Sequence, residues 1–224
     1  MSKIISLDGP TSSGKTSVGF LFAKKIGYTF IDSGSIYRAG AIAALKNGVI
    51  LDDENHIADI FKDLSLDFRE EDNKQHTFLS GEDVTNILHN PEVTAVVPVI
   101  AAFKKVRDAA AQIQHEVSSR QDTVLAGRDI GTEIFPNAKL KFYLTADIQI
   151  RAHRRFDQLI QKVPDITYDQ VLEDMIERDK KDMLRKISPL RIPKDAIIID
   201  TTTISTEETV EKMLEHYNKQ IHLE

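Results

Sequence analysis

The chain has 224 residues, of which 41% are hydrophobic and 29% are charged, a balance typical of a globular protein with one core. Its formal net charge of −6 argues against general nucleic-acid or acidic-membrane binding, and the lack of cysteine excludes disulfides and thiolate metal sites. No apolar run reaches the roughly 20 residues of a membrane span, and the N-terminal residues lack a signal-peptide pattern, so we expect a cytoplasmic protein.

The first part of the chain alternates between short apolar runs and amphipathic stretches. Residues 3–7 and 28–32 are apolar runs that predict buried strands, while residues 16–27 and 35–48 have helical spacing and end at glycines. This order of strand, helix, strand and helix predicts a parallel sheet with right-handed crossovers.

The middle of the chain departs from this alternation. The runs "LSLDF" and "HTFLS" flank the charged turn "REEDNK", which predicts a small antiparallel lobe over residues 62–90. A helical stretch begins at Asn90-Pro91, and residues 103–119 predict a further helix.

The parallel pattern then resumes and continues to the C-terminus. Strands are predicted over residues 122–126, 139–145 and 196–200. Helices are predicted over residues 147–161, 168–186 and 206–220. The predicted fold is therefore an α/β core with a five-stranded parallel sheet and one inserted lobe.

A glycine-rich loop follows the first predicted strand and matches the pattern G-x-x-x-x-G-K-[ST]. Its residues are Gly9, Pro10, Thr11, Ser12, Ser13, Gly14, Lys15 and Thr16. Glycines let the backbone N–H groups point at phosphate oxygens, and the following helix offers its positive N-terminal end. Lys15 is placed to bridge the β- and γ-phosphates and the Thr16 hydroxyl to ligate Mg²⁺. The loop predicts binding of a nucleoside triphosphate without specifying the acceptor.

Charged residues follow two other predicted strands, in the segments "IDSGSIYRAG" and "GRDIGT". They place Arg38, Arg128 and Asp129 beyond the carboxyl ends of strands, where open α/β sheets bind ligands. Phosphoryl transfer needs positive groups around the phosphate oxygens together with Mg²⁺, so arginines converging at this edge favour a phosphotransferase.

Two predicted helices carry further arginines, in the segments "ERDKKDMLRK" and "RAHRRF". Arg178, Asp182 and Arg185 recur at i, i+4 and i+7 and fall within ~60° of one another on one helix face. Arg151 and Arg155 are likewise four residues apart. Taken alone, both sets are also explained as solvated faces with salt-bridge ladders.

Several segments together resemble bacterial cytidylate kinases. These segments are "LDGPTSSGKTS", "IDSGSIYRA", "SGEDVTNILHNPEV", "GRDIGTEIFPNAKLKFYLTA", "RAHRR" and "ERDKKD…R…SPL", in this order along nearly the whole chain. The resemblance implies a single P-loop kinase domain over residues 1–224, with an inserted lobe that binds the nucleoside monophosphate at about 62–95 and a helical lid at about 151–170. It implies transfer of the γ-phosphoryl group of ATP to CMP or dCMP, with Mg²⁺ as cofactor, by a monomer that has no nucleic-acid or membrane partner.

The resemblance also implies roles for single residues. Arg38, Arg128 and Arg185 would hold the acceptor phosphate, and Asp182 and Arg178 would meet the ribose. The implied catalytic set is Lys15, Arg38, Arg128, Arg155 and Arg185.

The remaining implied residues belong to the acceptor base and the lid. Ser33 would line the acceptor site, and Asp129 would contact cytosine together with Arg107. Arg151 would lie near adenine, with the phosphate loop, and Arg155 near the transferred phosphoryl group. The Val163-Pro164 break in the lid helices predicts the lid tip.

Three positions depart from the family pattern. Pro98 stands where the family usually has a serine that bonds the base, Leu88 where arginine is common, and Ala126 where an acidic residue usually precedes the glycine. Proline has no side-chain donor or backbone N–H, so Pro98 leaves base choice open. Loss of an acid at position 126 makes metal binding depend on Thr16 and the phosphates.

Two alternatives therefore stay open beside a CMP/dCMP kinase. One is a related kinase with relaxed or shifted acceptor choice, such as UMP. The other is an ATP-binding module with weak catalysis, for which Ala126 is the only support. No catalytic role is expected for the seven histidines, which lack metal-ligand spacing.

Overall fold

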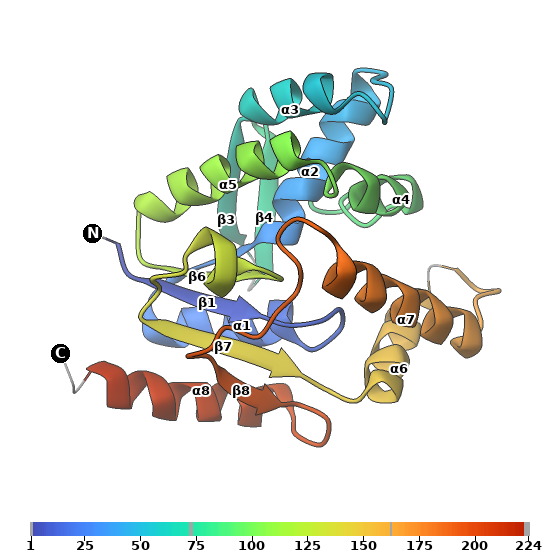
Figure 1. The fold of residues 1–224 in the computed structure, drawn as a ribbon. Coiled ribbons are helices and arrows are strands. Elements are labelled where there is room, and N and C mark those ends of the chain that lie inside the picture. The colour runs from blue at the N-terminus through green and yellow to red at the C-terminus, as the bar shows by residue number, and fades with distance from the viewer. Residues whose placement is uncertain (1, 72–73, 162, 222–224) are drawn as a thin grey trace.

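The computed structural model describes residues 2–71, 74–161 and 163–221, and its centre is a five-stranded parallel sheet (Figure 1). The strand order is β2-β6-β1-β7-β8. The strands are β1 (Ile4–Asp8), β2 (Thr29–Asp32), β6 (Thr123–Gly127), β7 (Leu140–Thr145) and β8 (Ile197–Asp200). All pairings within this sheet are parallel, which confirms the predicted fold class. The carboxyl ends of β1, β2 and β6 consequently lie together at one edge of the sheet.

Helices cover both faces of this sheet (Figure 1). On one face, α1 (Lys15–Ile26) and α8 (Thr206–Ile221) bury Phe22, Phe142 and Met213 against the strands. The opposite face is covered by α2 (Ser33–Lys46) and α5 (Lys104–Ser119), and α3 (Glu54–Lys62) and α4 (Pro91–Ile100) pack on these two helices. The central strands β1, β6 and β7 are thus buried on both sides, as their continuous apolar runs predict, whereas Ile198 of the edge strand β8 is exposed.

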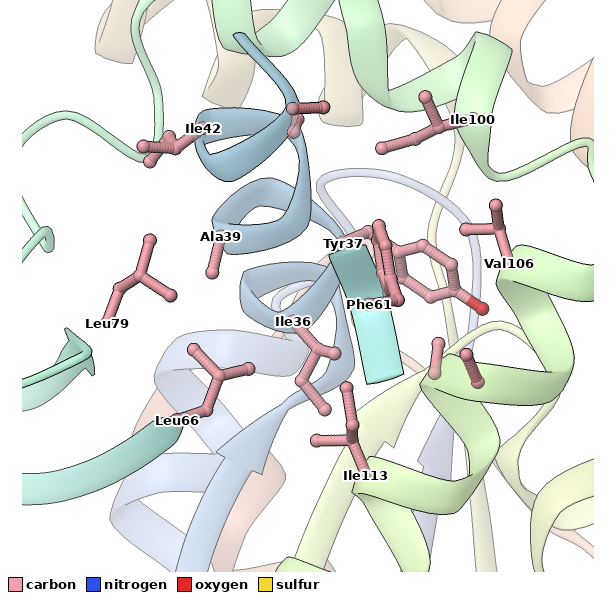
Figure 2. Close-up of a cluster of buried hydrophobic side chains, with 14 of the residues drawn as sticks. Ile36, Tyr37, Ala39, Ile42, Phe61, Leu66, Leu79, Ile100, Val106 and Ile113 are labelled. Atoms are coloured by element: carbon pink, nitrogen blue, oxygen red, sulfur yellow. The ribbon is translucent and has the colours of Figure 1, made fainter. Parts of the chain in front are cut away.

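A second, three-stranded sheet extends the layer formed by α2 to α5. It consists of β3 (Leu66–Glu71), β4 (Lys74–Leu79) and β5 (Glu82–Asp83). The predicted antiparallel pairing of the first two strands is confirmed, with Leu66 opposite Leu79. Figure 2 shows both leucines pointing toward Ile36 and Ala39 of α2, so the hairpin shares one core with the helices. Residues 72–73, within the predicted charged turn, lie outside the described residues.

Helices α6 (Ile148–Leu159) and α7 (Tyr168–Leu184) form a separate arm beyond the carboxyl end of the central sheet (Figure 1). Their buried contact is a small cluster of its own around Ala152, Val171 and Met175. Thr167 caps α7 through a capping box with Gln170. Val163-Pro164 lies in the connection between the two helices, and residue 162 beside it is outside the described part of the chain.

The structure differs from the sequence-based expectation at three elements. Helix α3 was not predicted, although Asp53 caps it by accepting from His56 N at 3.0 Å and its apolar residues share one face. A short π-helix, η1 (Ile130–Ile134), follows β6. Helix α7 ends at Leu184, so Arg185 is an extended C-cap residue and not part of the helix face proposed for it.

No helix in residues 2–71, 74–161 and 163–221 combines the length and the apolar character that crossing a membrane requires.

Candidate active site

The phosphate loop leaves β1 and turns tightly over the carboxyl edge of the sheet. Gly9 has a φ of 152°, and a Cβ placed there would lie 2.1 Å from the carbonyl oxygen of Leu144. Gly14, with a φ of 94°, occupies the N-cap position of α1. Side chains are excluded by space at the first glycine and by backbone conformation at both, so the two glycines allow this turn.

Lys15 is held inside the loop. Its Nζ donates to the carbonyl oxygen of Pro10 at 2.5 Å and to Ser13 Oγ at 3.3 Å. Burial and the neighbouring charge of Arg128 hold the pKa of Lys15 well below its usual value. Negatively charged phosphate oxygens beside this ammonium group would oppose both effects.

Thr16 lies at the start of α1 and faces the end of β2. Its Oγ1 donates to Asp32 Oδ2 at 3.1 Å, and Asp32 Oδ1 also accepts from Gly34 N at 2.9 Å, which caps α2. Asp32 pairs in register with Ala126 of β6, so the carboxylate lies on the strand beside the position where the family pattern expects an acid. A hydroxyl and one carboxylate fit Mg²⁺, which usually binds through one or two carboxylates, waters and substrate phosphates.

Asp8 connects the phosphate loop to the segment "GRDIGT". Its two carboxylate oxygens accept from the backbone N–H groups of Ile130 at 2.8 Å and Gly131 at 2.7 Å. Burial raises the pKa of Asp8 to about 6, because these hydrogen bonds and the charge of Lys15 only partly offset the loss of water. The π-helix η1 is therefore tied directly to the last residue of β1.

Arg128 and Asp129 belong to one ion-pair network that is joined by Arg185. Arg128 Nε donates to Asp182 Oδ2 at 2.9 Å, which links the end of β6 to α7. Asp129 is buried between Arg107 of α5, to which it is bonded, and Arg185, whose Nη2 lies 3.4 Å from Asp129 Oδ1. Arg185 also approaches Asp182, at 3.6 Å, so residues from α5, β6 and α7 meet at one place.

Four arginines lie close enough together near this ion-pair network to affect one another's pKa. The pKa of Arg178 is lowered to about 10 by burial first and then by the charges of Arg128 and Arg38. The pKa values of Arg38 and Arg155 are lowered by burial and by neighbouring arginines, Arg128 and Arg155 for the first and Arg178 for the second. Positive charge is thus concentrated beside Lys15, which is the electrostatic environment that a polyphosphate requires.

Arg151 is buried and ties the arm to the phosphate loop. Its Nη1 donates to the carbonyl oxygen of Thr11 at 3.1 Å and to Asp179 of α7 at 2.6 Å, while Nε donates to the carbonyl oxygen of Ala146 at 2.9 Å. Arg151 does not lie on a solvent-exposed helix face, which was the alternative explanation of its spacing, because its side chain is only 8% exposed.

The three departures from the family pattern lie in different surroundings. Pro98 is exposed in the last turn of α4, and Ala101, just beyond that helix, accepts from Arg107 Nη1 at 3.3 Å. Leu88 is buried in the core shared by α2 to α5, so this position favours an apolar side chain. Ala126 is 1% exposed among the strands.

Most of the residues that meet here were predicted from the sequence, but two carboxylates were not. Asp8 and Asp32 are each the last residue of a strand and lie within the site segments "LDGPTSSGKTS" and "IDSGSIYRAG", which is the signal that could have found them. Ser33, predicted to line the acceptor site, is buried at the start of α2, where its Oγ lies close to Gly127. Among the described residues, no group of three or more His, Cys, Asp or Glu side chains forms a metal cluster.

The sequence profile of the cytidylate kinase family matches residues 5–219 of the chain. The chain belongs to the cytidylate kinase family. It is 40% identical to a cytidylate kinase of Caldicellulosiruptor bescii, with 99% of this chain and 98% of that protein covered. It is 38% identical to a cytidylate kinase of Ligilactobacillus salivarius, with 97% of each chain covered. Membership of this family makes the chain a kinase.

Two solved structures are similar to this cytidylate kinase family member at low sequence identity. An uncharacterized protein from Eubacterium ventriosum is 10% identical and superimposes with a TM-score of 0.53, covering 97% of this chain and 99% of its own. A shikimate kinase from Acinetobacter baumannii is 19% identical, with a TM-score of 0.48 and coverage of 98% and 94%.

Proposed function

We propose that the chain transfers the γ-phosphoryl group of ATP to CMP or dCMP, giving ADP and CDP or dCDP. The observation that carries this proposal is the concentration of arginines from four elements beside the phosphate loop. Arg38 comes from α2, Arg128 from the end of β6, Arg155 from α6 and Arg178 from α7. Together they offer more positive charge than a hydroxyl acceptor needs, which favours an acceptor that itself carries a phosphate.

The chain's residues act by position and charge. The backbone of the phosphate loop and Lys15 would bind the β- and γ-phosphates, while Arg38, Arg128 and Arg185 would hold the acceptor phosphate in line with them. Arg155 would lie beside the phosphoryl group in transit. The attacking oxygen belongs to an already ionised phosphate, so no general base is required.

Mg²⁺ is the proposed cofactor, and it would neutralise charge on the transferred phosphates. Thr16 and Asp32 are the residues placed to hold it or its waters. Asp32 lies directly beside the expected acid position, because it pairs in register with Ala126 on the neighbouring strand.

The base of the acceptor would be recognised by the buried group around Asp129. Arg107 and Arg185 fix the Asp129 carboxylate from two sides, so a cytosine amino group would meet an acceptor that is already positioned. Ser33 would line the same acceptor site, and Asp182 and Arg178 would bind the ribose.

Helices α6 and α7 would act as the lid, and the hairpin β3–β4 would belong to the lobe that binds the nucleoside monophosphate. The arm has its own small core, and Arg151 with Asp179 joins its two helices, which supports movement as one body. Lid closure would exclude water from the γ-phosphate.

The proposal is tested by steady-state ADP production with Mg-ATP against CMP, dCMP, UMP, AMP and GMP. We expect CMP and dCMP to be preferred, with Arg107 and Asp129 supplying base recognition despite Pro98. Asp129→Ala should raise the KM for CMP and so narrow the difference between the KM values for CMP and UMP. Preference for UMP would shift the proposal to the related kinase, and ADP formation that no acceptor stimulates would contradict it.

A further inference from the structure

The outer edge of β2 is closed by one side chain from the small sheet. Thr29 N donates to Asp122 O on the side of β6, so along β2 the backbone groups of Phe30 and Asp32 face away from the central sheet. Gln75 of β4 lies there: its Nε2 donates to Phe30 O at 2.5 Å, and its Oε1 accepts from Asp32 N at 3.4 Å. One carboxamide thus makes both bonds that a residue of a further parallel strand would make.

The segment of β2 that Gln75 binds ends at Asp32, a residue of the proposed Mg²⁺ site. Asp32, whose N–H Gln75 accepts, is the residue whose carboxylate contacts Thr16 and caps α2. A shift of this backbone would move the carboxylate with it, because only the rotatable bonds of one short side chain separate them. Gln75 is therefore linked through the backbone of Asp32 to a carboxylate that contacts Thr16 beside the phosphate loop.

The hairpin has a further polar contact with the rest of the chain, and this one does not involve β2. Glu70 of β3 forms an ion pair of 2.9 Å with Lys24 of α1, and both side chains are nearly half exposed, at 48% and 44%. Exposed pairs of this kind contribute little free energy. Among the hydrogen bonds and ion pairs of the described residues, those of Gln75 are the ones that join the hairpin to the strand that carries Asp32.

We propose that Gln75 is a positioning residue for phosphoryl transfer, holding Asp32 where it contacts Thr16. The inference rests on the proposed role of Thr16 and Asp32 toward Mg²⁺. In this arrangement, the contact of the β3–β4 hairpin with the edge of β2 strengthens the nucleotide binding that depends on Mg²⁺. Closing an exposed sheet edge is a structural role for the same bonds, and it predicts no effect that depends on metal.

The test is calorimetric titration of ADP into the full chain, once with Mg²⁺ and once with a chelator. The dissociation constant with chelator, divided by the dissociation constant with Mg²⁺, measures how much the metal strengthens nucleotide binding. Gln75→Met keeps the length of the side chain and removes both hydrogen bonds. We expect this ratio to fall about three- to ten-fold, as one lost hydrogen bond gives, with metal-free ADP binding unchanged.

Glu70→Ala is the matched control on the same hairpin, and it should leave the ratio unchanged. If Gln75→Met does not fold, Gln75→Glu keeps the acceptor for Asp32 N, loses the donor to Phe30 O, and should also lower the ratio. An unchanged ratio in a folded Gln75 variant, or an equal fall in Glu70→Ala, would overturn the inference. A ratio of one in the unmodified chain would instead refute the metal role of Thr16 and Asp32, and the inference with it.

Discussion

At the scale of single residues, the site depends on carboxylates that are held by backbone N–H groups. Asp8 binds the N–H groups of Ile130 and Gly131, and Asp32 binds that of Gly34. Each carboxylate therefore fixes the first turn of a helix, η1 or α2, beside residues of the proposed site. Such bonds give geometric precision to side chains that themselves make no contact with the carboxylates.

Asp8 gives a pH dependence with a defined sign. Its pKa is about 6 in the folded chain, against 3.8 without burial, so its contribution to stability is fully present below about pH 4 and is lost as the pH rises through 6. The difference corresponds to about 3 kcal/mol. Asp8→Asn cannot titrate, so the variant should gain stability relative to the unmodified chain between pH 4 and pH 7.

Denaturant unfolding of both proteins across this pH range measures the effect. The constant offset between them reflects the amide, which accepts fewer hydrogen bonds than a carboxylate, and only the slope carries the prediction. A difference in the free energy of unfolding that stays constant with pH would show that Asp8 titrates normally.

At the scale of elements, the π-helix η1 shows why local sequence patterns missed part of the site. Periodicity predicts regular helices and strands, whereas η1 follows from Asp8, which is far away in sequence and binds its first N–H groups. The pairing of Gln75 with β2 is equally non-local. Helix α3 is a different case, because Asp53 and the apolar face of Ile57 and Phe61 were visible in the sequence.

Close packing of η1 against β1 predicts a sensitive glycine. A Cβ at Gly131 would lie 2.7 Å from Ser6 Oγ and 3.2 Å from Asp8 Oδ2, both buried and short side chains with little freedom to move. Gly131→Ala should therefore destabilise the fold by about 1–3 kcal/mol. It should also lower phosphoryl transfer, because η1 positions Arg128 and Asp129.

The measurement is thermal unfolding together with ADP production, and exposed Glu133 on the same π-helix provides the control. Glu133→Ala should change the free energy of unfolding by no more than about 0.5 kcal/mol. Equal stability of the two variants would argue against tight packing at Gly131.

At the scale of the whole molecule, the central sheet could be predicted from the sequence. The pairing of the charged residues with one another at its carboxyl edge could not. Short apolar runs alternating with helices define a parallel sheet, whose carboxyl edge collects the loops after β1, β2 and β6. The pairing of Arg128 with Asp182, across 54 residues of chain, depends on how α7 lies over that edge. Sequence spacing placed Arg178, Asp182 and Arg185 on one helix face, whereas Arg185 reaches the same site from beyond the helix end.

Phosphoryl transfer from ATP to a cytidine monophosphate is best tested by following the phosphoryl group itself. The chain is incubated with Mg²⁺, CMP and ATP labelled in the γ-phosphate, and the labelled products are separated. We predict label in CDP, with a fall of about a hundred-fold or more in Lys15→Ala, because a charge contact to the transferred group is lost. Label released only as inorganic phosphate would contradict transfer to CMP, and CDP labelling that Lys15→Ala leaves unchanged would contradict the role of Lys15.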